Sequence, residues 1–319
     1  MKKLISVILI IFILTFLLNG CKSESTKSDK ISVVTTVFPI YDLAREVIGD
    51  NENVELTLLS KLGTDLHSYQ PSAEDIIKIS SCDLFIYIGG ASDKWVENAL
   101  KNAVNKKMLS LNLIKELGDK AYEEEIVEGM QPETEETEEG TEYDEHIWLS
   151  LKNCELFTDL ISKSLSKIDS DNSQGYKTNA SNFAEKLSVL DKEYLEAFES
   201  SKKSPILFAD RFPFRYLVDD YGIKYYAAFA GCSSESEASF ETISFLANKV
   251  NEDSLKAVAV LEGSNKKIAE TVINASGKKD VEILTLNSMQ NVSESDIKNG
   301  KTYLSIAKAN LETIKKLLG

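Results

Sequence analysis

Hydrophobic residues along the chain fall into short β-rich runs that alternate with segments of helical periodicity. Such alternation is typical of βα units built on a mostly parallel sheet. Three of these runs precede residue 91 and four more follow residue 204, so the pattern predicts an α/β protein with two lobes. The runs are ISVVTTV (31–37), VELTLLS (54–60), LFIYIGG (84–90), PILFAD (205–210), GIKYYAAF (222–229), AVAVLEG (257–263) and VEILTL (281–286).

Between the two groups of strands, apolar residues recur every three or four positions without a proline, which predicts one long helix over about 173–201. We therefore expect an N-terminal lobe over 31–170, a linking helix within 171–203 and a C-terminal lobe over 204–319. In each lobe, the mostly parallel sheet should be flanked by helices. Ligands of such sheets bind at the carboxyl ends of the strands, so the cleft between the lobes is the expected binding site.

The N-terminus has the features of an export signal. Two lysines precede an apolar run (4–18) that is too short for a stable membrane span. The following LNGC (18–21) resembles the lipobox of bacterial lipoproteins, and the resemblance implies that Cys21 is lipidated. We expect a signal peptide over 1–20 and a lipid-anchored tether over 21–30, on the extracytoplasmic face of the cell membrane. An ordinary signal peptide followed by an unrelated cysteine is the alternative.

The composition restricts the partners and the cysteine chemistry. With 51 Asp and Glu against 36 Lys and Arg, the formal net charge is −15, which disfavours nucleic acid and suits cations or a cell-surface setting. Of the other cysteines, Cys82, Cys154 and Cys232, at most one pair can form a disulfide. No CxxC spacing occurs, so a cysteine-rich zinc site is not expected. We expect a monomer.

One segment interrupts the alternation of strands and helices. Residues 123–145 contain twelve acidic side chains, no basic ones and little apolar material. This composition predicts a solvated, mobile loop in the N-terminal lobe. Two interpretations stay open: the loop is a spacer without a role, or it gathers cations beside His146, which follows it directly.

The chain contains two histidines, His67 in GTDLHSYQP (63–71) and His146 in DEHIWLS (144–150). Imidazole binds transition metals and moves protons near neutral pH. His67 follows a predicted strand and His146 follows the acidic loop, so both are expected to face the cleft. A lone histidine is more commonly a hydrogen-bonded structural residue, but the sequences around these two favour a metal site.

Five stretches resemble, in order and spacing, the metal-binding lipoproteins of ABC transporters for zinc and manganese, the cluster A-I or ZnuA/TroA-like solute-binding proteins. In that family both histidines bind the metal, which implies the same role for His67 and His146. The resemblance also implies a partner permease driven by a cytosolic ATPase, since nothing in this chain resembles a Walker motif. The stretches are TTVFPIYDLAREVIGD (35–50), GTDLHSYQPSAEDI (63–76), DLFIYIGG (83–90), DEHIWLS (144–150) and YLSIAKANL (303–311).

The chain departs from the family pattern at the third ligand. That ligand, His or Glu, opens a motif that runs through aromatic residues to Tyr-Gly, and the matching stretch is FADRFPFRYLVDDYGI (208–223). Arg211 stands at the position of the third ligand, and a permanently charged guanidinium cannot bind a cation. We predict that Asp210 is the metal ligand instead. The alternative is that the Asp210 carboxylate caps a helix beginning near Phe212.

The fourth ligand of the family is often an aspartate after the last strand, and LTLNSMQ (284–290) offers Asn287 there. An amide oxygen coordinates weakly, so Asn287 is the predicted ligand, with a water molecule in its place as the alternative. Glu262 and Cys232 also follow strands of the C-terminal lobe and stay candidates. For Cys232, the alternative is a small buried thiol.

The favoured function is capture of a divalent transition metal by a lipid-anchored receptor that passes it to the permease and catalyses no reaction. Zinc is preferred because the acidic insertion occupies the place where zinc-type relatives carry a metal-gathering loop; manganese or iron is the alternative. A metal-dependent surface adhesin also stays open. An exported zinc hydrolase with Glu262 or Glu241 as general base is disfavoured because no HExxH motif occurs.

Overall fold

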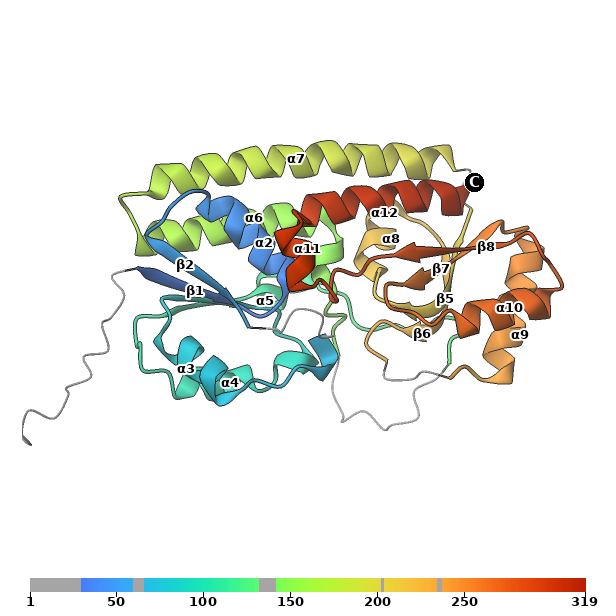
Figure 1. Ribbon diagram of the computed structural model, residues 1–319, viewed down its shortest axis with the longest axis horizontal. Helices are drawn as coiled ribbons and strands as arrows, with labels where there is room; N and C mark the ends of the chain where they lie inside the picture. Colours follow the sequence, from blue (N-terminus) through green and yellow to red (C-terminus); the bar gives the residue numbers. More distant parts are fainter. Residues whose placement is uncertain (1–29, 60–65, 132–141, 202–203, 234–236) are drawn as a thin grey trace, which may run out of the picture. The chain divides into compact units, whose positions relative to one another are not determined.

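The computed structural model describes residues 30–59, 66–131, 142–201, 204–233 and 237–319. The predicted signal peptide, Cys21 and the tether up to residue 29 lie outside the described residues. From Ile31 to Gly319 the chain forms one compact unit that contains two four-stranded sheets, both parallel throughout. Figure 1 shows helices packed around each sheet, which confirms the predicted α/β class with two lobes.

The N-terminal sheet has the strand order β2-β1-β3-β4. Val33 and Val34 of its central strand belong to separate hydrophobic clusters and are buried, as expected for a parallel sheet covered on both faces. The sequence pattern does not predict β4, because only Leu111 of its four residues is buried. The elements of this half are β1 (Ile31–Thr35), α2 (Phe38–Ile48), β2 (Val54–Leu58), η1 (Leu66–Ser68), α3 (Ala73–Ser81), β3 (Leu84–Tyr87), η2 (Ala91–Asp93), α4 (Val96–Lys101), β4 (Leu109–Asn112), α5 (Leu113–Leu117), η3 (Gly118–Lys120), η4 (Ile147–Leu149) and α6 (Leu151–Ile168).

The C-terminal sheet has the order β6-β5-β7-β8. All five residues of β7 are buried, and its side chains alternate between two clusters: Val258 and Val260 pack with α9 and α10, whereas Ala259 joins the larger core. The register of β5 against β6 shifts between Phe208 and Arg211. The elements are β5 (Ile206–Phe212), α8 (Arg215–Tyr221), β6 (Tyr225–Ala230), α9 (Phe240–Glu252), β7 (Ala257–Leu261), α10 (Lys267–Ser276), β8 (Glu282–Leu286), α11 (Glu294–Lys298) and α12 (Tyr303–Leu318).

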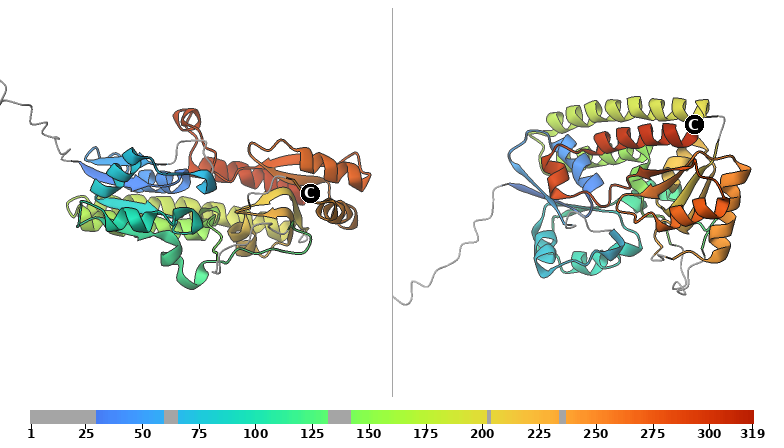
Figure 2. Two further views of the ribbon diagram at one scale, coloured as in Figure 1. Left: turned by 90° about the horizontal axis from the view of Figure 1, so that it is seen from below. Right: turned by 45° about the vertical axis from the view of Figure 1, so that its right-hand side comes forward.

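One long helix, α7 (Ser173–Ser200), links the last element of the first half to β5, as the sequence predicts. Its apolar stripe joins a core that also contains residues of both sheets. Figures 1 and 2 show α12 (red) running beside α7 (yellow-green), and the Tyr194 hydroxyl of α7 donates a hydrogen bond to the Ala307 carbonyl of α12 at 2.7 Å. Although α7 has 28 residues, no helix in the described part of the chain is both long and apolar enough to cross a membrane.

The loops that follow β2, β3 and β6 carry the polar residues described below. Because the strands of each sheet are parallel, these loops leave the carboxyl ends of their strands, where ligands of such sheets bind. The loop after β2 contains η1 and ends at Ser72, which caps α3 in a capping box with Asp75. This cap defines where the loop that carries His67 ends.

Candidate metal centre

His67 and His146 meet in space although 79 positions separate them in the sequence. Their Nε2 atoms are 3.4 Å apart and their ring centroids are 5.3 Å apart. His67 belongs to η1, and His146 directly precedes η4. A tetrahedral zinc ion with bonds of about 2.0 to 2.3 Å separates its ligand atoms by roughly 3.5 Å, so the two Nε2 atoms are spaced as two ligands of one ion would be.

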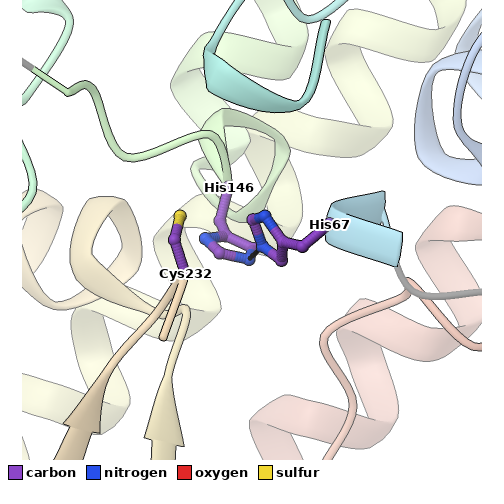
Figure 3. A group of neighbouring side chains, drawn as sticks. All are labelled: His67, His146 and Cys232. Atoms are coloured by element: carbon purple, nitrogen blue, oxygen red, sulfur yellow. Dashed lines mark hydrogen bonds between the residues drawn. The ribbon is translucent and has the colours of Figure 1, made fainter. Parts of the chain in front are cut away.

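Cys232 is the third member of this group. The closest ligand atoms of His67, His146 and Cys232 all lie within 4.8 Å of one another. Figure 3 shows the three side chains converging, with the thiol from the turn after β6 and the imidazoles from two loops of the N-terminal half. Among the His, Cys, Asp and Glu side chains of the described residues, these three form the group whose ligand atoms are close enough to share an ion. Two imidazoles and a thiolate are typical zinc ligands.

His146 is fully buried and held by its neighbours. Its Nδ1 lies 2.9 Å from Oδ1 of Asp144, and its backbone N–H donates to the same oxygen at 2.8 Å. Burial lowers the pKa of His146, but the surrounding carboxylates, Asp144 foremost, outweigh burial and leave this pKa raised. With Nδ1 occupied by a carboxylate, Nε2 is the nitrogen left for a metal, an arrangement common among metal-binding histidines.

His67 has a carboxylate at Nδ1 as well. This atom lies 3.2 Å from Oε2 of Glu145 and 3.1 Å from Oγ of Ser92. Glu145 is held in turn by the backbone N–H of Ser92 at 2.7 Å and by its hydroxyl at 2.5 Å. Burial raises the pKa of Glu145, but hydrogen bonds from His67 and Ser92 outweigh burial and lower it. Glu145 is therefore placed as an anion that orients His67.

Two glycines permit the close packing around the histidines. A Cβ at Gly90 would lie 2.2 Å from Oε1 of Glu145, so only glycine leaves room for this carboxylate. A Cβ at Gly231 would lie 2.8 Å from the Phe212 carbonyl and 3.2 Å from Cε1 of His146. The residue before Cys232 must therefore be small for the turn to approach His146.

The thiol of Cys232 lies in acidic surroundings. Burial, followed by the charges of Glu124 and Asp144, raises the pKa of Cys232 well above its ordinary value. Without a cation the group is therefore a neutral thiol. A divalent metal reverses this preference, because a coordinating thiol is deprotonated and the proton is released to solvent.

A pocket of about 270 Å³ adjoins the group. Its walls carry carboxylates, and these give the entrance to the histidines a negative potential that favours a cation. The residues that line it are His67, Ala91, Ser92, Glu124, Glu142, Tyr143, Glu145 and Cys232.

Comparison with known proteins shows the family of the chain. Residues 33–317 match the family described as the periplasmic component A of the zinc-uptake complex, ZnuA. The chain belongs to this family. The family resemblance inferred from the histidine motifs is thereby confirmed.

Two relatives and one solved structure are similar to the chain over most of its length. The zinc-binding lipoprotein AdcA of Streptococcus pneumoniae is 33% identical over 322 positions, which cover 99% of this chain and 61% of AdcA. The high-affinity zinc uptake system protein ZnuA of Bacillus subtilis is 28% identical over 301 positions, 93% of this chain and 90% of that protein. The Zn(II)-bound ZnuA-like domain of S. pneumoniae AdcA superposes with a TM-score of 0.70 at 29% identity, covering 91% of this chain and 99% of the domain. The chain thus spans about 61% of the length of the AdcA relative.

Asp210, the predicted substitute for the family's third ligand, is not in the group that contains the two histidines among the described residues. Its Oδ2 accepts a hydrogen bond from the Leu261 N–H at 3.2 Å, and its Oδ1 accepts one from the Arg211 N–H at 2.9 Å. The carboxylate therefore pairs with β7 at the register shift of β5. The alternative role as a helix cap does not apply either, since α8 has no side-chain cap and its N-cap residue is Phe214.

Asn287 and Glu262, the other candidates from the C-terminal half, also have partners there. Asn287 Oδ1 accepts from the Met289 N–H at 2.7 Å. Glu262 accepts from the Ser288 N–H at 2.8 Å and from the Ser288 hydroxyl at 2.6 Å. Glu241, the second candidate for a general base, is exposed in the first turn of α9.

Sequence reasoning missed the carboxylates that support the histidines. Asp144 and Glu145 fall in the segment predicted to be a solvated loop, yet both are buried. Glu124, also in that segment, lines the pocket. The signal that could have identified Asp144 and Glu145 is their position immediately before His146, which lies next to the aromatic residue Trp148.

Proposed function

We propose that this chain captures zinc at the site formed by His67, His146 and Cys232 and passes it to an ABC permease. The observation that carries the proposal is the convergence of two imidazole Nε2 atoms and one thiol, each imidazole having a carboxylate at Nδ1. Neutral imidazole and thiolate are ligands that zinc prefers. The proposed ligand set leaves out Asp210 and Asn287, whose side chains accept hydrogen bonds within the C-terminal half.

The same ligand set favours zinc over manganese. A thiolate is a soft ligand that suits zinc, whereas manganese prefers carboxylate, carbonyl and water oxygens. The names of the similar proteins point the same way, since AdcA is called zinc-binding and the B. subtilis relative is a zinc uptake protein.

The proposed setting is the extracytoplasmic face of the cell membrane, with a lipid on Cys21 and a permease driven by a cytosolic ATPase as partners. The LNGC sequence (18–21) supports the anchor, and the word lipoprotein in the name of AdcA agrees with it. The role is binding and delivery, without a chemical reaction. In support, neither candidate general base of a hydrolase is among the described residues that line the pocket beside the histidines: Glu262 is bonded to Ser288, and Glu241 is exposed on α9.

The test is a zinc titration of the chelator-stripped protein in competition with a chromophoric chelator. We expect one high-affinity zinc ion per chain, and we expect His67→Ala and His146→Ala each to weaken binding by several kcal/mol, because a site with few ligands has no spare one. Growth of a deletion strain in zinc-depleted medium, restored by the wild-type gene and not by the His146→Ala gene, tests delivery. Absence of zinc binding by the wild-type chain would remove the proposed function.

A further inference from the structure

The first residues of the acidic segment (123–145) lie beside the candidate metal centre, since Glu124 lines the same pocket as His67 and Cys232. Glu123 and Tyr143 form an antiparallel bridge. Two backbone hydrogen bonds flank it: the Glu124 N–H donates to the Glu142 carbonyl at 2.8 Å, and the Asp144 N–H donates to the Tyr122 carbonyl at 2.9 Å. The two described ends of the segment thus pair with each other. This pairing places Glu124 next to the strand-like stretch that leads into His146.

The C-terminal half holds the same stretch from the other side. The Tyr216 hydroxyl of α8 accepts from the Tyr122 N–H at 2.9 Å and donates to the Asp144 carbonyl at 3.1 Å. Arg215 of the same helix forms an ion pair with Glu125. Further along, the Gln131 N–H donates to the Ala228 carbonyl of β6 at 2.8 Å. Glu124 is therefore positioned by contacts with both halves of the molecule.

The carboxylate of Glu124 faces the candidate metal centre, and only one of its two oxygens has a hydrogen-bond partner among the described residues. Its Oε1 accepts from the Cys232 N–H at 3.3 Å. Its Oε2 is buried and has no hydrogen-bond partner among the described residues. A buried polar atom without a partner is costly and calls for an explanation, and one explanation is an ion that binds there. The pocket that Glu124 lines is the one that contains His67 and Cys232.

We propose that Glu124 supplies the fourth ligand of the zinc ion through its Oε2 atom. This inference rests on the proposed function, in which zinc binds His67, His146 and Cys232. Glu124 completes the four-coordinate shell that zinc favours, with two nitrogen, one sulfur and one oxygen ligand. One thiolate and one carboxylate also cancel the two charges of the ion, which reduces the cost of placing it in a buried site.

Binding through Glu124 requires a small movement. The closest atoms of the two histidines and Cys232 are within 4.8 Å of one another, and Glu124 is not part of that group, so its side chain turns toward the ion when zinc arrives. The acidic segment then contributes to affinity by direct coordination. This role is distinct from both roles considered for the segment from its sequence, a spacer and a collector of cations.

Glu124→Gln is the decisive variant, because it keeps the size of the side chain and removes the charge that zinc needs. Glu123→Gln is its matched control, since it makes the same change at the neighbouring, exposed position. We expect Glu124→Gln to weaken zinc binding at least about tenfold, because losing even an outer-shell partner costs 10- to 100-fold. We expect Glu123→Gln to bind zinc as the wild type does.

Cobalt(II) serves as the spectroscopic probe. In the wild type, the cobalt complex should have the strong visible bands of a tetrahedral ion and a thiolate-to-cobalt charge-transfer band. Glu124→Gln should alter the visible bands and keep the charge-transfer band, whereas Cys232→Ser should lose it. Thermal melting of the apo-proteins verifies that the variants fold. If Glu124→Gln does not fold, Glu124→Asp replaces it, because its side chain is one methylene shorter and is expected to weaken zinc binding as well.

The outcomes separate this inference from the proposed function. If the wild type binds zinc and Glu124→Gln binds it equally well with an unchanged cobalt spectrum, Glu124 is not a ligand and the proposed function stands. Equal weakening in Glu123→Gln and Glu124→Gln also overturns the inference, since it reflects the charge of the segment alone. If the wild type binds no zinc, the proposed function itself fails.

Discussion

At the residue scale, each histidine of the group has a carboxylate at Nδ1, Asp144 at 2.9 Å from His146 and Glu145 at 3.2 Å from His67. Both carboxylates come from the two positions immediately before His146. A carboxylate at Nδ1 fixes the ring orientation and makes Nε2 a better ligand. The short sequence Asp144-Glu145-His146 therefore provides one proposed ligand, His146, and the two carboxylates that orient His146 and His67.

Cys232 is the residue on which metal preference is expected to depend. Cys232→Ser keeps the size of the side chain and removes the soft ligand, so zinc affinity should fall at least about tenfold while manganese affinity changes less. Competition titrations with both metals measure the ratio. Cys82→Ser, a change at a buried thiol in the N-terminal half, is the control and should leave the ratio unchanged. Equal losses for the two metals in Cys232→Ser would exclude a thiolate ligand.

At the scale of single elements, the register shift of β5 accounts for the contact of the Asp210 carboxylate with β7. An irregularity of this kind turns a side chain away from the direction that regular alternation would give it. The carboxylate is directed to β7, where it accepts the Leu261 N–H that regular β5–β7 pairing would otherwise engage. The sequence predicts that Asp210 lies at the end of a strand, but it does not predict the direction in which the Asp210 side chain points.

Asp210→Asn should therefore affect stability more than metal binding. An amide keeps one acceptor oxygen but cannot accept both N–H groups, so the free energy of unfolding of the apo-protein should fall by about 1 to 3 kcal/mol. The rise in melting temperature on adding zinc should stay as large as in the wild type, since that rise follows zinc affinity. Thermal melts with and without zinc test this, with Asp280→Asn in an exposed ion pair as the control. Loss of the zinc-induced rise would return Asp210 to the ligand set.

Asp93, the last residue of the short helix η2, is a buried carboxylate. Its Oδ2 accepts from the Gly89 N–H at 3.0 Å, and burial, with the charge of Glu145, raises the pKa of Asp93 to about 6. An aspartate in the unfolded chain titrates near about 3.9. Between about pH 4 and pH 6 the folded protein therefore binds more protons than the unfolded chain through this residue, and its contribution to stability is lost as the pH rises.

Asp93→Asn removes this titration and keeps the acceptor for Gly89. The free energy of unfolding of the variant, relative to the wild type, should therefore increase as the pH rises from about 4 to 7. Urea denaturation of the metal-free proteins at several pH values measures the difference. The same series with Asp280→Asn, an exposed carboxylate, should show a much smaller change. A difference that does not vary with pH would contradict the raised pKa of Asp93.

At the scale of the whole molecule, the formal net charge of −15 and the acidic segment attract cations over a distance set by the salt concentration. Replacing four glutamates of the segment by glutamine should slow zinc association at low ionic strength and leave the equilibrium affinity nearly unchanged. The difference should shrink as salt is added. The four are Glu133, Glu135, Glu136 and Glu138, which lie outside the described residues.

Stopped-flow association kinetics at several salt concentrations test this prediction. Four exposed glutamates of α7 replaced by glutamine provide a control with the same change in net charge, and this control should slow association less. The four are Glu185, Glu193, Glu196 and Glu199. Equal slowing in both variants would mean that total charge matters and that the position of the segment does not.

The class of fold and the family could be predicted from local patterns in the chain. Alternating runs of strand and helix, together with the periodicity of α7, are local properties of the chain, so the two sheets and the long helix could be predicted from them. The motifs around His67 and His146 are local as well, and they indicated the family that residues 33–317 match. The strand β4 was missed because one buried residue in four makes no detectable pattern.

Which side chains surround the two histidines depends on long-range packing and could not be predicted from the sequence. Asp210 lies near the end of β5 and Cys232 follows the neighbouring strand β6, and their positions in the sequence do not distinguish them as ligands. The register shift in β5 directs Asp210 to β7, whereas the turn after β6, kept close by Gly231, brings Cys232 to His146. Glu124 reaches the same pocket because its segment pairs with the stretch before His146. These contacts join residues far apart in the chain, so their formation depends on backbone register and packing that no local pattern encodes.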